Sequence, residues 1–184
     1  MVNARKQPIL LIAFLISFFS LSLNSCSEEL VINLEGEWIV FPPNAFIGLT
    51  YNPDVSGSDN SLDAQEILDL ITASLEEATL ELVKLERIVF KSARSSSNEN
   101  IVEFYYHGET MPVLGTYEYD NAFFTIKNAT FPDGIRGLCN NSELEIYYPR
   151  DYVQIILRDK TALDISTINS FIKDLSGVGF YIRK

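Results

Sequence analysis

Residues 113–127, VLGTYEYDNAFFTIK, alternate apolar and polar side chains on both sides of a short turn. The runs 113–119 and 122–127 follow a period of two, which is typical of half-buried antiparallel strands. Asp120 and Asn121, which lie between the runs, are residues that tight hairpin turns favour. This stretch therefore predicts a β-hairpin.

The same alternation recurs before and after this hairpin. Six further runs show it, at 37–41, 87–91, 101–107, 143–148, 152–158 and 178–182. Pro149-Arg150-Asp151 predicts another hairpin turn, between the runs that end at 148 and begin at 152. A long meander of strands exposes two edges unless it curls closed. We therefore expect a mainly β fold with two helices, in which about eight strands form an up-and-down antiparallel barrel.

Two segments follow a helical period instead. Residues 165–175 predict a helix that is capped by Asp164, is stopped by Gly177 and precedes the last strand. A longer helix is predicted at 62–85, inserted after the first strand. Its apolar side chains recur at helical spacing and are Ile67, Leu68, Ile71, Leu75, Ala78 and Leu82.

The composition fits one globular domain and argues against several classes of function. The chain has 184 residues, of which 47% are hydrophobic and 21% are charged, and a typical domain has ~150 residues. Its 14 basic and 25 acidic side chains give a net charge of −11, and loss of a leader containing Arg5 and Lys6 would make it −13. Because such a surface repels phosphate backbones and anionic headgroups, we expect no nucleic-acid partner and no electrostatic adsorption to membranes.

The amino terminus has the pattern of an export signal. Arg5 and Lys6 precede an apolar stretch at 9–19, which is shorter than the ~20 residues needed to span a bilayer. The following Leu23-Asn24-Ser25-Cys26 resembles the bacterial lipobox, in which the cysteine thiol receives a diacylglycerol before cleavage. The resemblance implies a signal peptide at 1–25, a lipidated Cys26 in a tether at 26–33, and anchorage in the bacterial outer membrane. An ordinary signal peptide with a chance cysteine is the alternative.

The predicted tether begins with an acidic cluster. Ser27-Glu28-Glu29 resembles the surface-export tags of lipoproteins in some Gram-negative bacteria. This resemblance implies that the protein is exposed at the cell surface. A solvated acidic tether is the alternative.

The segment Leu34-Glu35-Gly36-Glu37-Trp38 matches the glycine-x-tryptophan start of lipocalin-like proteins. The order of about eight strands, a helix and one further strand is also similar to this family. The resemblance implies a lipocalin-like barrel at 34–184, in which the tryptophan plugs one end. It also implies an arginine packed on the tryptophan, for which Arg158 and Arg183 are the candidates. The long first helix departs from the family, and a helix in that place would cap the open mouth of the barrel.

The chain has few groups suited to catalysis or metal binding. His107 is its one histidine, and Cys26 and Cys139 are its two cysteines, so the usual zinc ligand sets are excluded. Cys139 is expected to be an inert, half-buried thiol. Glu143 and Glu145 share one strand face, and we expect them to solvate the outside of the barrel. We therefore predict no enzyme activity, no catalytic or metal-binding residues, and no cofactor.

Many aromatic side chains fall on the predicted inner face of the barrel. They are Trp38, Phe90, Phe104, Tyr106, Tyr117, Tyr119, Phe124, Tyr148 and Phe180. An eight-stranded barrel is either just filled by its side chains or just wide enough for one small ligand. The sequence leaves both arrangements open.

Two functions are compatible with this pattern. The first is a non-catalytic binding module that holds a small apolar or amphipathic ligand in the mouth of the barrel. The second is an envelope protein with a filled barrel that docks on another protein, through the long helix or the loop 52–60. For the first function, the ligand-binding residues would be Trp38, Tyr106, Tyr117, Tyr119 and Tyr148.

Overall fold

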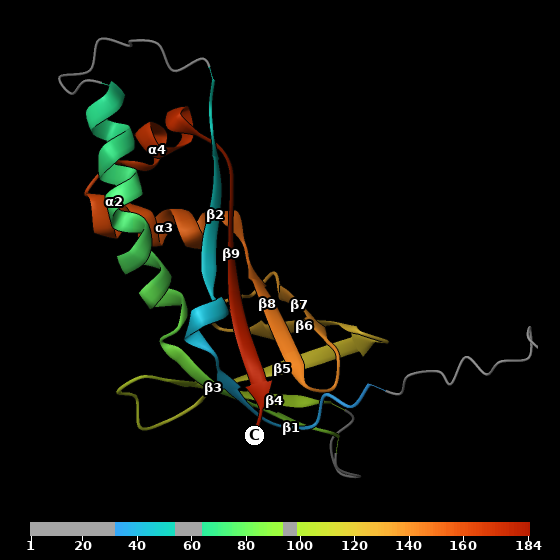
Figure 1. The fold of residues 1–184 in the computed structure, drawn as a ribbon. Helices are drawn as coiled ribbons and strands as arrows, with labels where there is room; N and C mark the ends of the chain where they lie inside the picture. Colours follow the sequence, from blue (N-terminus) through green and yellow to red (C-terminus); the bar gives the residue numbers. More distant parts are fainter. Residues whose placement is uncertain (1–31, 54–63, 94–98) are drawn as a thin grey trace, which may run out of the picture. The chain divides into compact units, whose positions relative to one another are not determined.

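The computed structural model describes residues 32–53, 64–93 and 99–184, which form an antiparallel barrel with helices packed on it (Figure 1). The predicted signal peptide and lipidation site, Cys26, lie outside the described residues. Within the described ranges, each helix is too short or too polar to cross a lipid bilayer.

The sheet of the described residues has nine strands. Their bounds are β1 (Gly36–Val40), β2 (Phe46–Tyr51), β3 (Leu85–Lys91), β4 (Ile101–Tyr106), β5 (Val113–Asp120), β6 (Phe123–Asn128), β7 (Ile135–Cys139), β8 (Glu143–Tyr148) and β9 (Ile172–Arg183). Strand β1 followed by β3 to β9 forms a ring of eight, which closes where β1 pairs with β9. The extra strand, β2, pairs with β9. The predicted fold, a mostly β chain with a closed barrel of about eight strands, is confirmed.

Helices and one helical turn connect several of these strands. They are the 3-10 turn η1 (Pro42–Asn44), α2 (Ala64–Leu82), α3 (Arg150–Thr161) and α4 (Ile165–Phe171). Helix α2 corresponds to the helix predicted at 62–85, but it follows β2 rather than the first strand, and Leu85 belongs to β3. Helix α4 begins at the predicted cap, where the Asp164 carboxylate accepts a hydrogen bond from the Thr167 backbone N–H at 2.7 Å. However, α4 ends at Phe171 rather than at 175. Gly177 is not its stop, because the chain continues directly into β9.

Residues 152–158, which were predicted to form a strand, belong to helix α3. The prediction was wrong because the buried apolar residues are Val153, Ile156 and Leu157, and their spacing of three and four positions is helical. Pro149 does not form a hairpin turn. It is the extended N-cap residue of α3.

Strands β2 and β7 are not apparent from alternation in the sequence. Both strands are short, and each contains a glycine, Gly48 in β2 and Gly137 in β7, at a position where alternation would need a side chain. The period of two is therefore too brief to be recognised in either strand.

Core side chains pack against one another across the interior of the barrel. The ring of Phe90 meets those of Tyr117 and Phe124 edge-on, with 4.9 and 5.6 Å between ring centroids. The Phe124 ring lies across Gly137, where an added Cβ would be less than 3.0 Å from it. The largest fully buried side chains of the core are Trp38, Tyr181, Phe90, Phe104, Ile71, Leu82, Leu85, Ile88, Ile126, Ile135, Leu144 and Ile146.

Helices α2 and α3 pack on the inner side of β9. A Cβ added at Gly177 would lie 3.1 Å from Leu82 and 3.0 Å from Val153, so the missing side chain lets both helices approach the strand. Glu81 of α2 also forms an ion pair with Lys160 of α3 at 2.6 Å. The helices and the barrel therefore share one core.

Candidate functional site

Trp38, the first predicted ligand-binding residue, is fully buried. Its indole N–H donates a hydrogen bond to the Leu34 carbonyl oxygen at 2.9 Å. The guanidinium carbon of Arg183 lies 4.7 Å from its ring centroid, in a cation–π contact. Arg158, the other candidate for this contact, pairs with Asp159 instead. Trp38 is therefore a packed residue whose polar edge and ring face both have protein partners.

Tyr117 and Tyr119 form a second group, with 6.1 Å between their ring centroids. Tyr117 is buried, whereas Tyr119 is 55% exposed. A hollow of about 40 Å³ lies beside them and is also lined by Ile32 and Leu34. Small-molecule pockets usually measure ~300–1,000 Å³. This hollow is smaller than the usual pocket for a small-molecule ligand.

Tyr106 and Tyr148 have a third set of neighbours. Tyr148 stacks on Tyr152 with 5.4 Å between ring centroids, and its hydroxyl lies 3.3 Å from that of Tyr181. Burial raises the pKa of Tyr148 well above its usual value and that of Tyr106 to about 12. These phenols are therefore neutral over the physiological range. The five predicted site residues therefore fall into three sets with different neighbours, which are Trp38, then Tyr117 with Tyr119, then Tyr106 with Tyr148.

The groups considered for catalysis are also accounted for. His107 is exposed, as predicted, and its Nδ1 lies 2.6 Å from a carboxylate oxygen of Glu86. Cys139 is a buried free thiol, and burial raises its pKa. Glu143 and Glu145 lie on the outer face of the sheet, as expected. Over the part of the chain that is described, no three His, Cys, Asp or Glu side chains are grouped so that they could hold a metal ion.

Exposed aromatic side chains gather on the outside of the barrel, where two rows cross the strands. One row, across β6, β7, β8 and β9, consists of Phe123, Leu138, Glu145 and Phe180. The next row, across β7, β8, β9 and β2, consists of Arg136, Tyr147, Val178 and Phe46. We call these two rows the outer face.

Phe180 was predicted to lie on the inner face, and this was wrong. Tyr181 is fully buried and takes the inner position, while Phe180 is only partly buried on the outer face. The reason is that residues 178–182 are apolar on both faces of the strand. Alternation alone cannot choose between the two faces in such a run.

A groove of about 490 Å³ lies on the outer face, and we call it the outer groove. It is lined by Pro43, Asn44, Ala45, Phe46, Glu145, Tyr147, Val178 and Phe180. Its origin is the Pro42-Pro43 pair, because proline lacks the N–H that a sheet ladder needs. The chain leaves the sheet after β1, makes the turn η1 and returns to the same partner, β9, as β2. The turn therefore forms a wall beside a floor of strands.

The outer groove combines aromatic rings with polar groups. Phe46 and Tyr147 are 51% and 39% exposed and flank Val178, which is buried between them. The Tyr147 hydroxyl donates a hydrogen bond to Glu145 Oε2 at 2.5 Å, and this bond is the main cause that raises the pKa of Tyr147 to about 12. Among the described residues, Glu145 Oε1 and the side-chain amide of Asn44 have no hydrogen-bond partner. Both remain available to a ligand.

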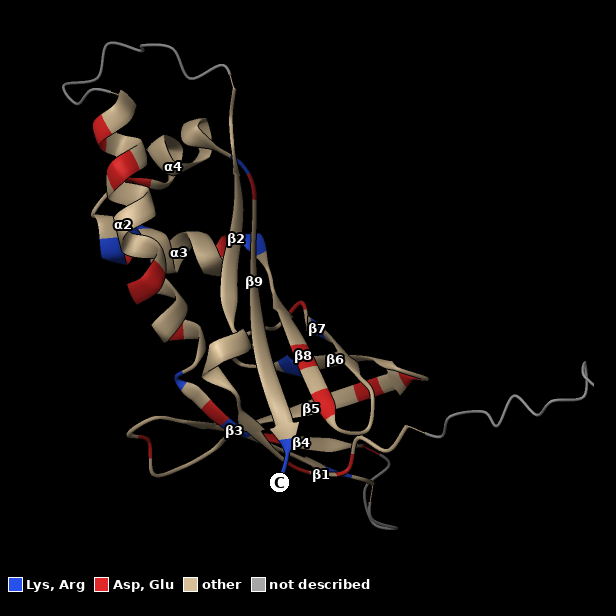
Figure 2. Ribbon diagram, in the orientation of Figure 1, with Lys and Arg blue, Asp and Glu red and all other residues tan. Residues whose placement is uncertain are grey.

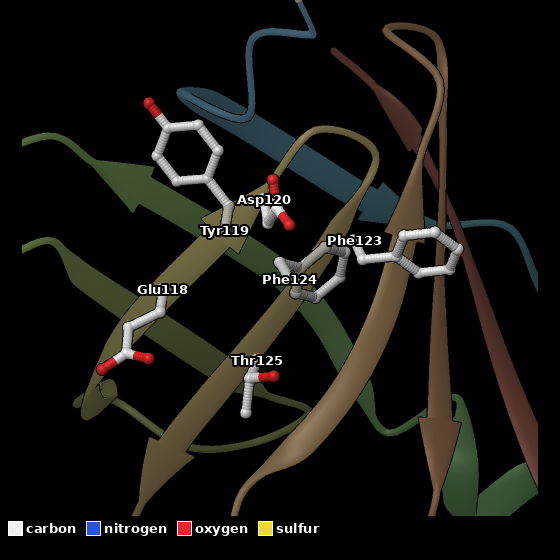
Figure 3. A pocket seen from close by; sticks show the side chains of 6 residues that line it. All are labelled: Glu118, Tyr119, Asp120, Phe123, Phe124 and Thr125. Atoms are coloured by element: carbon white, nitrogen blue, oxygen red, sulfur yellow. The ribbon is translucent and has the colours of Figure 1, made fainter.

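A second hollow, of about 240 Å³, lies at the end of the β5–β6 hairpin (Figure 3). Figure 3 shows the rings of Tyr119 and Phe123 extending in different directions, with the carboxylates of Glu118 and Asp120 nearby. Its volume is below the ~300 Å³ of the smallest usual ligand pockets. The outer groove is the stronger candidate.

The strands of the outer face carry charges of both signs, which are Glu143, Glu145, Asp174, Lys127, Arg136, Lys173 and Arg183. Figure 2 shows acidic side chains along α2, β5 and β8. Arg136, directly opposite Tyr147 in the register of β7 and β8, is the cation adjacent to the outer groove. The net charge of −11 disfavours an anionic ligand, and a positive charge lies beside Tyr147.

The long helix is a weaker docking surface than the sequence suggested. The exposed large apolar side chains of α2 are Leu70 and Leu80. They are ten positions apart, or about 15 Å along the helix axis. The proposed docking loop, 52–60, lies mostly outside the described residues.

Phe46, Tyr147 and Phe180 were not among the predicted site residues. A signal was present for Tyr147, because the alternation in 143–148 places it on the same face as Glu143 and Glu145. Neither Phe46 nor Phe180 has such a signal. Their positions depend on strand pairing between distant segments.

Comparisons of the chain with protein-family models, with curated protein sequences and with solved structures find no match.

Proposed function

We propose that the protein is a non-catalytic, lipid-anchored module of the bacterial outer membrane that binds its ligand on the outside of a filled barrel. The observation that carries this proposal is the volume of the outer groove. The hollow beside Tyr117 and Tyr119 has about 40 Å³, whereas the outer groove has about 490 Å³, within the ~300–1,000 Å³ of usual ligand sites.

The surroundings of the reactive side chains support a binding role over an enzymatic one. The thiol of Cys139 is buried and its pKa is raised, so little thiolate forms at neutral pH. His107 is exposed and bonded to Glu86. Neither lies in the outer groove.

The contact between Arg183 and Trp38 supports the lipocalin-like part of the proposal. An arginine packed on the tryptophan of the Gly36-Glu37-Trp38 segment is what the resemblance implies. The family's usual ligand position, inside the barrel, is where this proposal departs from it.

The lipid anchor is tested by metabolic labelling with an alkyne fatty acid. We expect wild-type protein to be labelled and Cys26→Ser to remain an unlabelled precursor, since serine has no thiol to be alkylated. Cys139→Ser is the matched control, because it removes the other cysteine of the chain and should leave labelling unchanged. Equal labelling of Cys26→Ser and wild type would refute the anchor.

The filled interior is tested by titrating the purified protein with palmitate and with Nile red. Trp38 is the single tryptophan and belongs to the buried core, so its fluorescence reports on a ligand that enters the barrel. We expect no saturable quenching and no palmitate retained in native mass spectrometry. Retention of one palmitate per chain, with quenching of Trp38, would favour a ligand in the barrel mouth and overturn the proposal.

A further inference from the structure

We propose that the ligand of the outer groove is a neutral oligosaccharide; this inference rests on the proposed function, since it names the ligand class for the same external site. The groove presents Phe46, Tyr147 and Phe180 together with two unpaired polar groups. Sugars are a ligand class that makes both kinds of contact at once.

The aromatic side chains suit the apolar faces of sugar rings. A pyranose ring exposes a face of C–H groups that packs against the flat ring of Phe or Tyr, whereas its rim carries hydroxyls. Phe46 and Tyr147 stand on either side of Val178, so they provide two ring surfaces along one floor. Two rings of one oligosaccharide would contact them, one on each side of Val178.

The polar groups suit the hydroxyls on the rim. Glu145 is held by Tyr147, which occupies Oε2 and leaves Oε1 to accept an O–H hydrogen bond. Asn44, in the turn η1 on the opposite wall, has an amide that both donates and accepts. A sugar hydroxyl also both donates and accepts, so it can pair with either group.

Charge and desolvation argue against the other ligand classes. A purely apolar partner would bury the Glu145 carboxylate without a new hydrogen bond, which is costly. An anionic polymer would meet a protein with a net charge of −11. A cationic group would lie near Arg136, which is opposite Tyr147 on the neighbouring strand.

The experiment is calorimetric titration of the purified protein with neutral hexasaccharides of glucose, xylose, mannose and N-acetylglucosamine. Wild-type protein should bind at least one of them in a one-to-one complex. Phe46→Ala and Tyr147→Ala should each weaken that binding about tenfold or more, because each removes one stacking surface. Glu145→Gln should cause a smaller loss, since an amide oxygen still accepts a hydrogen bond.

The matched control is Phe123→Ala. Phe123 is an aromatic residue of the outer face and is 65% exposed, but it does not line the outer groove. Its replacement should leave saccharide binding unchanged. Near-ultraviolet circular dichroism and the urea midpoint of each variant separate loss of a contact from loss of the fold.

The saccharide assignment is overturned if no hexasaccharide binds, if both groove variants bind as wild type does, or if Phe123→Ala weakens binding equally. Saturable binding of a cationic peptide at Phe46 and Tyr147, without saccharide binding, would also overturn it. These outcomes refute the ligand class only, and the proposed function, a binding site on the outside of the barrel, still stands. Retention of palmitate in the barrel, in contrast, refutes the proposed function and leaves the saccharide titration as a separate result.

Discussion

Replacing Gly137 with alanine measures directly how full the barrel interior is. A Cβ at this position would lie less than 3.0 Å from the ring of Phe124 and from the backbone carbonyl oxygen of Glu145. The ring could move only into neighbouring core side chains, and the carbonyl belongs to the adjacent strand. The added methyl group therefore cannot be accommodated without displacing packed atoms.

The magnitude follows from two opposing effects. Overpacking a core usually costs ~1–3 kcal/mol, and overlap with a backbone atom favours the upper end of this range. Replacing glycine by alanine stabilises the folded state by ~0.4–1 kcal/mol, because the unfolded chain loses freedom. We expect Gly137→Ala to lower the free energy of unfolding by about 2 kcal/mol and the melting temperature by about 4–8 °C.

The assay is urea denaturation followed by the fluorescence of Trp38, the single tryptophan. Gly48→Ala is the matched control, because it also adds a methyl group to a strand glycine. Its nearest contact would be the flexible Ser176 hydroxyl at 3.3 Å, so its stability should equal or slightly exceed that of wild type. Adding Phe124→Leu to Gly137→Ala should restore part of the lost stability.

A specific result would refute this reasoning. If Gly137→Ala unfolds within about 0.5 kcal/mol of wild type, the Phe124 ring does not lie across residue 137. The interior would then have room to spare. A ligand inside the barrel would again become the better explanation of the aromatic residues.

Three further predictions concern stability. Arg183→Gln removes the cation over the indole and should lower the free energy of unfolding by about 1 kcal/mol; an unchanged urea midpoint would contradict this. Burial raises the pKa of Tyr106 and of Tyr117 to about 12, so from their usual value near 10 upward only the unfolded state loses these protons. Stability should therefore be independent of these groups below pH 10 and fall between pH 10 and 12, and ultraviolet detection of these phenolates at pH 10–11 in fully folded protein would contradict it. Glu81→Gln breaks the ion pair with Lys160 and should cost less than ~1 kcal/mol, because solvent screens the pair; the difference from wild type should vanish in 1 M salt. The pKa of Glu81 is lowered mainly by its hydrogen bond to Lys160. The stability that this pair contributes should therefore be lost as the pH falls below 4.5 and through the lowered pKa. A Glu81→Gln variant that is equally destabilised at pH 3 and at pH 7 would argue against this.

Sequence patterns within a few neighbouring residues were sufficient to predict some of the elements. The hairpin at 113–127 was predictable because alternation and turn residues lie in one window, and Asn121 does adopt a positive φ of 54° in its turn. The cap at Asp164 was predictable because an N-cap needs only the next three residues. The long helix α2 was predictable from repeated apolar positions on one face.

Other features were not predictable because contacts with distant parts of the chain determine the secondary structure or the orientation of the side chains. The run 152–158 contains apolar residues that fit either period, and its burial against the barrel selects the helix. Phe180 and Tyr181 are both aromatic, so only the pairing of β9 with β8 determines which of them points inward. The outer groove depends on Phe46 and Tyr147 meeting across β9, a register that no local window contains.

Strand β9 also sets the order in which the molecule can fold. It forms ladders with β1, β2 and β8, so the ring lacks a segment until this last strand has been synthesised. Trp38 pairs with Arg183, and contacts between such distant residues form slowly because a long loop must close first. In a chain exported as proposed, late closure would keep the polypeptide threadable through a translocation channel. The position of β9 near the end of the described residues would then determine when the barrel closes.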